Sequence, residues 1–368
     1  MNLLSKPIPN YIHSLQLENF TCFAKADLQF SKGINVLIGE NGTGKTHILK
    51  LLYLIEENPI ILDIVGTELR VNVLGYYNVF QDIFKVEKAK QLVRLQNEEA
   101  ISKIHANITT QYISFEMNKT DASIQEINPK PRSDFSPIKK ECLFLPPQQM
   151  LSTFEGFVAA YENRESSFDQ TYYDLAKKLS LLPLKGERLE EAQGLLKSLK
   201  EKIAIDVFQK GGKFFIRYEE YDLESSLEAD GVNKIAQLIY LILNGSLNKN
   251  TILFWDEPEN SLNPKWVKLL ADFLKVLALE GVQIFVATHD YLLSHHLSLF
   301  AEYEKDINKD EEEIQVPDMK FFCLAKGKSG TEIFEGKHLG EIPNNPILDE
   351  FARHYDLEEK LEAKYFDV

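Results

Sequence analysis

Residues 39–46, GENGTGKT, fit the pattern G-x-x-x-x-G-K-[ST] of a phosphate-binding loop. Glycines in such a loop let backbone N–H groups turn inward around phosphate oxygens, and the helix that follows adds the positive end of its dipole. The pattern predicts that Lys45 reaches the β- and γ-phosphates of a nucleotide and that the Thr46 hydroxyl is a ligand of Mg²⁺. The residues expected to hold the nucleotide are Gly39, Asn41, Gly42, Thr43, Gly44, Lys45 and Thr46.

Two acidic residues at the end of a second apolar run could supply the rest of the chemistry. Asp256 and Glu257 directly follow residues 251–255, TILFW. Ligand sites in open α/β sheets lie at the carboxyl ends of strands. We therefore predict that Asp256 holds the Mg²⁺ shell and that Glu257 polarises the attacking water as general base. Two acids at a strand end are common by themselves, so this assignment depends on the phosphate-binding loop in the same chain.

A histidine follows a third apolar run. Residues 282–288, VQIFVAT, predict a buried strand, and His289 comes directly after it. A single histidine is usually structural, but this strand should neighbour the one that ends at Asp256. Because such sheets place their ligand contacts at strand ends, we predict that His289 senses the γ-phosphate.

The elements around the phosphate-binding loop can be predicted from the pattern of apolar residues. Residues 34–38 predict a buried strand before the loop, and residues 46–55 predict a helix after it, which is the context that such a loop requires. Alternation in residues 11–20 predicts an edge strand. Residues 86–105 predict an amphipathic helix with a solvated charged face, and the polar, proline-containing residues 118–140 predict a surface loop.

The second half of the chain returns to alternating helices and strands. Residues 151–202 have mostly helical spacing, and residues 208–218 predict a hairpin around Gly211 and Gly212. Asn263 and Pro264 predict the start of a helix, because asparagine caps the first turn and proline fits its first position.

Charge and cysteine usage limit the class of protein. The 368 residues include 41 Lys plus Arg against 56 Asp plus Glu, a formal net charge of −15. This surface does not favour broad, sequence-independent binding to nucleic acid, although it allows a local basic groove. Cys22, Cys142 and Cys323 are widely separated and show neither a disulfide framework nor metal-ligand spacing. We expect a cytoplasmic protein without a signal peptide or membrane span.

The motifs, taken in order, resemble the head of an ABC-type ATPase. LQLENFTCF followed by GINVLIGENGTGKT resembles the RecF, SMC and OLD-family branch, and ILFWDEPENSLNP is similar to bacterial AAA-family ATP-binding proteins of phage-defence systems. The resemblance implies an α/β P-loop NTPase fold: an ABC-ATPase-like head with a mixed central sheet, a helical lobe and no long coiled coil. It also implies three segments: ATPase lobe I over residues 1–145, helical lobe II over residues 146–230, and a return to lobe I over residues 231–368.

Further site residues are implied only by this resemblance. The Q-loop glutamine, which would bridge Mg²⁺, the attacking water and the helical lobe, should be Gln148 or Gln149, with Gln148 slightly preferred. The D-loop should be residues 260–263. The signature motif should be residues 227–234, where Gly231 and Asn233 would contact the nucleotide of an opposite subunit. Ala229 stands where the family usually has serine, so one hydrogen bond is missing and slow turnover is expected.

The resemblance therefore implies an ATPase that binds ATP and Mg²⁺ as a homodimer with two sandwiched nucleotides. We expect this dimer, or a higher oligomer, to control a separately encoded effector protein in anti-phage defence. Two alternatives stay open: a RecF-like ATPase of DNA repair or maintenance, and an ATP-gated scaffold that barely hydrolyses ATP.

Overall fold

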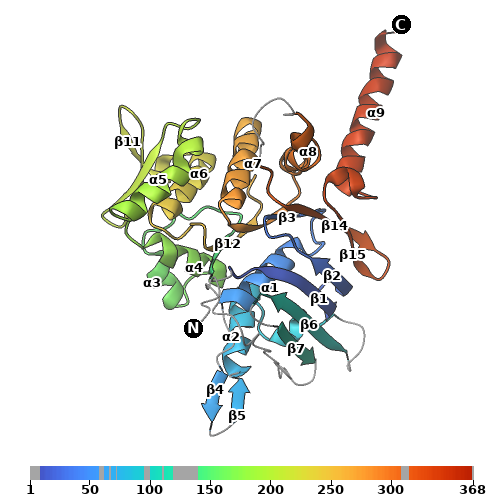
Figure 1. Cartoon of the computed structure of the whole chain (residues 1–368), viewed down its shortest axis with the longest axis horizontal. Helices are drawn as coiled ribbons and strands as arrows, with labels where there is room; N and C mark the ends of the chain where they lie inside the picture. The colour runs from blue at the N-terminus through green and yellow to red at the C-terminus, as the bar shows by residue number, and fades with distance from the viewer. Residues whose placement is uncertain are drawn as a thin grey trace, which may run out of the picture.

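A six-stranded mixed sheet forms the centre of the molecule (Figure 1), with the strand order β15-β14-β3-β13-β12-β8. The computed structural model describes residues 9–57, 62–65, 68–71, 73–94, 100–109, 112–118, 140–307 and 315–366. The strands of the central sheet are β3 (Ile34–Gly39), β8 (Glu141–Leu145), β12 (Thr251–Asp256), β13 (Gln283–Thr288), β14 (Met319–Gly327) and β15 (Gly330–Gly336). All neighbours in this sheet pair in parallel except β14 and β15. Every residue of β3, β12 and β13 is buried, because helices or a second sheet cover both faces.

A four-stranded antiparallel sheet, in the order β2-β1-β6-β7, covers one side of the molecule. Its strands are β1 (Ile12–Phe20), β2 (Phe23–Gln29), β6 (Ile101–Ile108) and β7 (Tyr112–Asn118). Helix α1 (Lys45–Glu57) packs between this sheet and the central sheet, and its leucines and isoleucines share one core with both. The strand predicted at residues 11–20 is present, but it lies inside the sheet, so its prediction as an edge strand was wrong.

The helix predicted over residues 86–105 was also wrong. Within its described part, the chain forms the 3₁₀ helix η1 (Ala89–Leu92) and then strand β6. Alternate residues of β6 are buried, among them Ile104 and Ala106, and the strand pairs with both β1 and β7. Tertiary pairing and a period of two thus prevail over the helical spacing of the charged residues. The predicted surface loop at residues 118–140 lies, except at its ends, outside the described residues.

Helices cover the other face of the central sheet, together with a small sheet in the order β11-β10-β9. The helices are α3 (Phe157–Glu162), α4 (Gln170–Leu179), α5 (Glu187–Lys200), α6 (Asp230–Leu243), α7 (Pro264–Leu279) and α8 (Tyr291–Ile307). The strands are β9 (Asp206–Lys210), β10 (Lys213–Arg217) and β11 (Asp222–Glu224). The predicted hairpin is confirmed, and both glycines of its turn have positive φ, 61° at Gly211 and 81° at Gly212.

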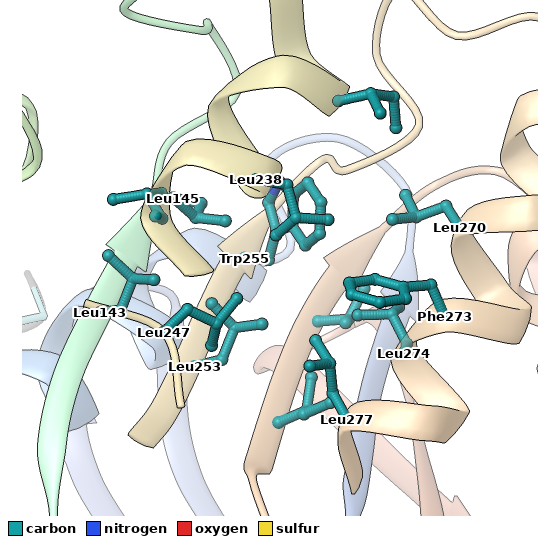
Figure 2. Close-up of a cluster of buried hydrophobic side chains, with 14 of the residues drawn as sticks. Leu143, Leu145, Leu238, Leu247, Leu253, Trp255, Leu270, Phe273, Leu274 and Leu277 are labelled. Carbon is teal, nitrogen blue, oxygen red and sulfur yellow. The ribbon is translucent and has the colours of Figure 1, made fainter. Parts of the chain in front are cut away.

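Alternation along the central strands divides the interior into two cores. On β12, Ile252 and Phe254 belong to the core shared with α1, whereas Leu253 and Trp255 belong to the core shared with α6 and α7. Figure 2 shows the second core, where Leu238 of α6 and Phe273 of α7 lie over these strands. Packing on both faces of β12 therefore fixes the direction of the Asp256 side chain at the end of this strand.

The remaining elements lie around this framework. They are α2 (Val73–Phe84), β4 (Leu62–Val65), β5 (Glu68–Val71), the 3₁₀ helices η2 (Ser225–Leu227) and η3 (Leu339–Glu341), and α9 (Pro346–Phe366). Asn263 caps α7 by accepting a hydrogen bond from the Trp266 N–H, as predicted. Helix α9 projects away from the body (Figure 1). None of the helices in the described ranges is long and apolar enough to cross a membrane.

Candidate nucleotide-binding and catalytic site

The predicted phosphate-binding loop joins the end of β3 to the start of α1. Two of its glycines, Gly39 and Gly44, are required by close neighbours as well as by their backbone angles. A Cβ at Gly39 (φ 154°) would lie 2.2 Å from the Leu324 carbonyl oxygen, and one at Gly44 (φ 94°) would lie 2.4 Å from Cys22 Sγ. The Thr43 hydroxyl donates to the Glu40 carbonyl oxygen at 2.8 Å and closes the loop on itself. The loop is thus held between β14 on one side and the β1–β2 turn on the other.

Lys45 lies along this loop. Its Nζ donates to the carbonyl oxygens of Gly39 and Glu40 at 2.7 and 2.9 Å. Burial lowers the pKa of the lysine, and the nearby carboxylates of Asp256 and Glu257 oppose that shift. The ammonium group is therefore kept close to the acidic end of β12, where it can exchange carbonyl oxygens for phosphate oxygens.

The structure joins the two halves of the predicted metal site. The Thr46 hydroxyl donates to Asp256 Oδ2 at 2.8 Å. The second oxygen, Oδ1, is buried and has no hydrogen-bond partner among the described residues. Burial raises the pKa of Asp256 to about 6, against the opposing hydrogen bond from Thr46. A hydroxyl and a carboxylate with a free oxygen are ligands that Mg²⁺ prefers, so these residues fit that ion.

Glu257 and His289 meet beside Asp256. The Nδ1 atom of His289 lies 3.3 Å from Oε1 of Glu257. Glu257 has a left-handed backbone, φ 48°, and its N–H donates to the Ala287 carbonyl oxygen at 2.8 Å. Non-glycine residues seldom adopt this conformation, and such strain concentrates at functional sites.

Sequence reasoning gave no role to Glu259, the second glutamate of the DEPE motif. Its side chain is buried, and its Oε1 accepts hydrogen bonds from the Thr288 hydroxyl at 2.7 Å and from the His289 N–H at 3.3 Å. Burial raises the pKa of this carboxyl. Glu259 therefore fixes the end of β13 and, with it, the backbone of His289.

The two candidate Q-loop glutamines have different environments. Gln149 is buried, and its Nε2 donates to Ser152 Oγ at 2.7 Å and to Asp230 Oδ1 at 3.0 Å. Gln148 is exposed, and it lines a cavity of about 190 Å³ together with Ser261. The side chain of Gln148 is exposed, whereas that of Gln149 joins its own segment to the start of α6.

Gly231 and Asn233, which are predicted to contact the nucleotide of an opposite subunit, both pack against other residues of the same chain. Gly231 is buried, and a Cβ there would lie 2.5 Å from the Ser261 carbonyl oxygen of the same chain. Asn233 is 0% exposed, and its Nδ2 donates to the Ser225 carbonyl oxygen at 2.8 Å. Their contact with the nucleotide of an opposite subunit stays a prediction. The exposed residues at this helix start are Ala229 and Asp230.

A direct link between α1 and α4 also escaped the sequence analysis. Lys50 Nζ lies 2.6 Å from Asp169 Oδ2, and the Tyr53 hydroxyl donates to Asp174 at 2.9 Å. Asp169 also caps α4 by accepting from the Thr171 N–H at 2.9 Å. The helix that follows the phosphate-binding loop is thereby fastened to the helical part of the molecule.

Comparison with known proteins places this site in a family. Residues 34–294 match the family model described as "AAA domain, putative AbiEii toxin, Type IV TA system". The chain belongs to this family. The matched residues include the phosphate-binding loop, the Asp256–Glu257 pair and His289. The predicted relationship to P-loop ABC-type ATPases of the RecF, SMC and OLD branch is confirmed, and so is the predicted fold class.

Individual relatives agree with this family. The chain is 46% identical over 43 residues to the DNA replication and repair protein RecF of Pediococcus pentosaceus, which is 12% of each chain. It is 30% identical over 95 residues to the RecF protein of Clostridium kluyveri, covering 26% of this chain and 20% of that one. These matches span only a small part of the relatives. A crystal structure of an Smc head bound to the C-terminal winged-helix domain of ScpA shares the fold, with a TM-score of 0.54, 12% identity and coverage of 89% of this chain and 97% of that one.

Proposed function

We propose that this protein binds Mg-ATP and hydrolyses it slowly as an ATP-gated homodimer that controls a separately encoded effector. The observation that carries the proposal is the meeting of four side chains beside the phosphate-binding loop. Thr46 bonds to Asp256 at 2.8 Å, and His289 lies 3.3 Å from Glu257. Residues from the start of α1 and from the ends of β12 and β13 thus converge where a γ-phosphate bound by the loop would lie.

Each side chain has a role that its surroundings support. Lys45 binds the β- and γ-phosphates, and Thr46 and Asp256 hold Mg²⁺, which when bound neutralises charge on the phosphate oxygens. Glu257 accepts a proton from the attacking water as general base, and His289 orients that carboxylate and contacts the γ-phosphate. Gln148, exposed beside the same cavity as the D-loop residue Ser261, completes the water shell.

The segments beside the site form two lobes in this proposal. Residues 1–145 and 231–368 form ATPase lobe I, and residues 146–230 form helical lobe II. The exposed start of α6, at Ala229 and Asp230, faces the nucleotide of the second subunit. Backbone N–H groups of a helix start attract phosphate without a serine hydroxyl. The missing hydroxyl and the acidic Asp230 both weaken this contact, which supports slow turnover or, at the extreme, an ATP-gated scaffold.

The effector and its setting are inferred from the family. The family description names a putative toxin and a type IV toxin–antitoxin system, and from this wording we infer a separately encoded effector. Family analogy alone supports the defence role. The second candidate, a RecF-like role on DNA, is favoured by the local identity to RecF proteins and opposed by the net charge of −15.

One set of measurements tests the core of the proposal. Wild-type protein is expected to release phosphate from ATP only with Mg²⁺ and to sediment as a dimer with a non-hydrolysable ATP analogue. Lys45→Ala should lose tight ATP binding, because each charge-assisted contact contributes about 1.5–3 kcal/mol. Unchanged ATP affinity in this variant would refute the assignment of the loop. Salt-dependent binding of duplex DNA at physiological salt would favour the RecF-like role instead.

A further inference from the structure

A buried lysine lies behind the proposed general base. Lys234 is on α6, three positions after Gly231, and its side chain is 3% exposed. Its Nζ donates to the carbonyl oxygens of Glu257 and Pro258 at 3.1 and 3.4 Å. Lysine is almost never fully buried unless its charge has partners. Here the partners are two backbone carbonyls of the turn at residues 257–261, which is called the catalytic turn below.

The turn that Lys234 contacts is held in an uncommon conformation. Glu257 has φ 48° and Ser261 has φ 65°, both in the left-handed region. The N–H of Glu257 donates to the Ala287 carbonyl oxygen of β13, and its C=O accepts from Lys234 Nζ and from the Asn260 N–H, each at 3.1 Å. The backbone N–H is therefore fixed by the central sheet, and the carbonyl is fixed by α6 and by the turn itself. The direction of the Glu257 carboxylate depends on these bonds, because a left-handed residue relaxes when its surroundings do not hold it.

Acidic side chains explain how a charged group is retained at this position. Burial lowers the pKa of Lys234 to about 8, and Glu259, Glu257, Asp230 and Asp256 oppose the shift. The first turn of α6 also meets the catalytic turn through Gly231, whose missing side chain admits the Ser261 carbonyl oxygen. The start of α6 and the catalytic turn thus form one packed unit.

We propose that Lys234 is a positioning residue for ATP hydrolysis: its bonds to the Glu257 and Pro258 carbonyl oxygens hold Glu257 in the left-handed conformation that aims its carboxylate at the attacking water. This inference rests on the proposed function, in which Glu257 is the general base. It adds that a residue of α6, remote from the phosphate-binding loop in sequence, sets the geometry of that base. A structural change at the exposed start of α6 then alters the position of Glu257 through a single turn of that helix.

A second buried lysine offers a matched control. Lys140 is 2% exposed, and its Nζ donates to the Gly281 carbonyl oxygen at 2.6 Å and lies 4.1 Å from the centre of the Tyr11 ring. Lys140 immediately precedes β8, and Gly281 lies just before β13, so this contact is at the amino ends of the parallel strands. The candidate site is at their carboxyl ends. Lys140 therefore shares the burial and the bonding of Lys234 without its location.

The experiment compares Lys234→Met, Lys234→Arg and Lys140→Met in the full-length protein, with ATP turnover and ATP affinity measured separately. Lys234→Met should lower kcat about 10- to 100-fold, the effect of losing a charge-assisted hydrogen bond, while ATP affinity changes less than about threefold. Lys234→Arg, which keeps the charge and the donors, should recover most of the kcat. Lys140→Met should keep the wild-type kcat even where it lowers the melting temperature.

A double variant separates positioning from general destabilisation. If Lys234 acts through Glu257, adding Lys234→Met to Glu257→Gln should lower the residual kcat no further, because the base is already absent. Equal losses of kcat in Lys234→Met and Lys140→Met, or full additivity with Glu257→Gln, would overturn the inference. Should Lys234→Met fail to bind ATP or to melt cooperatively, Lys234→Gln replaces it, and a wild-type kcat in that variant counts against the inference. A wild-type protein that binds but does not hydrolyse ATP would instead refute the proposed ATPase itself, and with it this role.

Discussion

The Thr46 hydroxyl donates a 2.8 Å hydrogen bond to Asp256 Oδ2, although the two residues are 210 positions apart in the chain. This bond joins the phosphate-binding loop to the end of β12 and leaves Oδ1 of the same carboxylate buried without a hydrogen-bond partner among the described residues. A buried carboxylate with one free oxygen destabilises the fold at neutral pH until a cation binds it. The pair is thus arranged for a metal ion at the expense of the free protein's stability.

Asp256→Asn should therefore stabilise the free protein at neutral pH. Burial raises the pKa of Asp256 from 3.8 to about 6, so the folded state disfavours the charged form. The contribution of the protonated Asp256 carboxyl to the free energy of unfolding is fully present below pH 4, and it is lost as the pH rises through about 6. In EDTA at pH 8, the variant should gain up to about 3 kcal/mol in free energy of unfolding, since each pKa unit corresponds to about 1.4 kcal/mol.

The same variant supplies its own control. Below pH 4 the wild type and Asp256→Asn should have similar stability, and Mg-ATP should stabilise the wild type far more than the variant. Urea unfolding at both pH values, with and without Mg-ATP, gives all four comparisons. If the wild type is as stable as the variant at pH 8, burial does not disfavour the charged form of Asp256 in the free protein.

Glu257→Gln should separate ATP binding from hydrolysis. Its amide preserves the size of the side chain but accepts no proton, so turnover should fall by roughly 10²–10⁴-fold, the usual contribution of a general base. ATP affinity should stay close to that of the wild type, and sedimentation should show a dimer that persists in ATP. Wild-type phosphate release by this variant would place the base elsewhere.

The parts of the site that sequence could predict are those in which one segment contains all that is needed. Residues 39–46 combine glycines, lysine and threonine between a buried strand and a helix, and that local order is enough. Asp256 and His289 follow apolar runs long enough to be strands of the central sheet. The strand at 101–108 was missed because its partner β1 lies far earlier in the chain, and cross-strand packing decides such cases.

The motifs could not predict the roles of residues whose contacts lie on other elements of the fold. Lys234 bonds to carbonyl oxygens of the turn after β12, and Glu259 bonds to the Thr288 hydroxyl at the end of β13. Only the folded chain brings these groups together. Glu259 was visible as the last letter of DEPE, but its partner Thr288 belongs to another strand. Asn233 matched a position in a motif, but the motif did not predict that its Nδ2 donates to the Ser225 and Glu228 carbonyl oxygens.

Ala229→Ser should strengthen the closed dimer by more than it stabilises the monomer. Ala229 is the N-cap of α6, and no side chain there accepts a bond from the helix start. A serine restores one hydroxyl, with a contribution of about 0.5–1.5 kcal/mol per hydrogen bond. Sedimentation with an ATP analogue should show association at up to about tenfold lower protein concentration. Stabilisation of the monomer alone, by an amount typical of helix capping, would indicate that the hydroxyl serves only the helix.

Gly231→Ala distinguishes packing within the chain from contact with a second subunit. The added Cβ would lie 2.5 Å from the Ser261 carbonyl oxygen, so the catalytic turn or α6 must move. Overpacking of this kind usually destabilises by about 1–3 kcal/mol. We expect a lower melting temperature and slower ATP turnover, while the monomer still binds ATP. Gly194→Ala is the matched control, because Gly194 is in the interior of α5 with open space around it. Alanine there should be neutral or stabilising by about 0.5–1 kcal/mol. If Gly231→Ala instead melts like the wild type and loses only ATP-driven association, the glycine serves the approach of a second subunit. The Ser261 carbonyl group then moves to make room for the added methyl group.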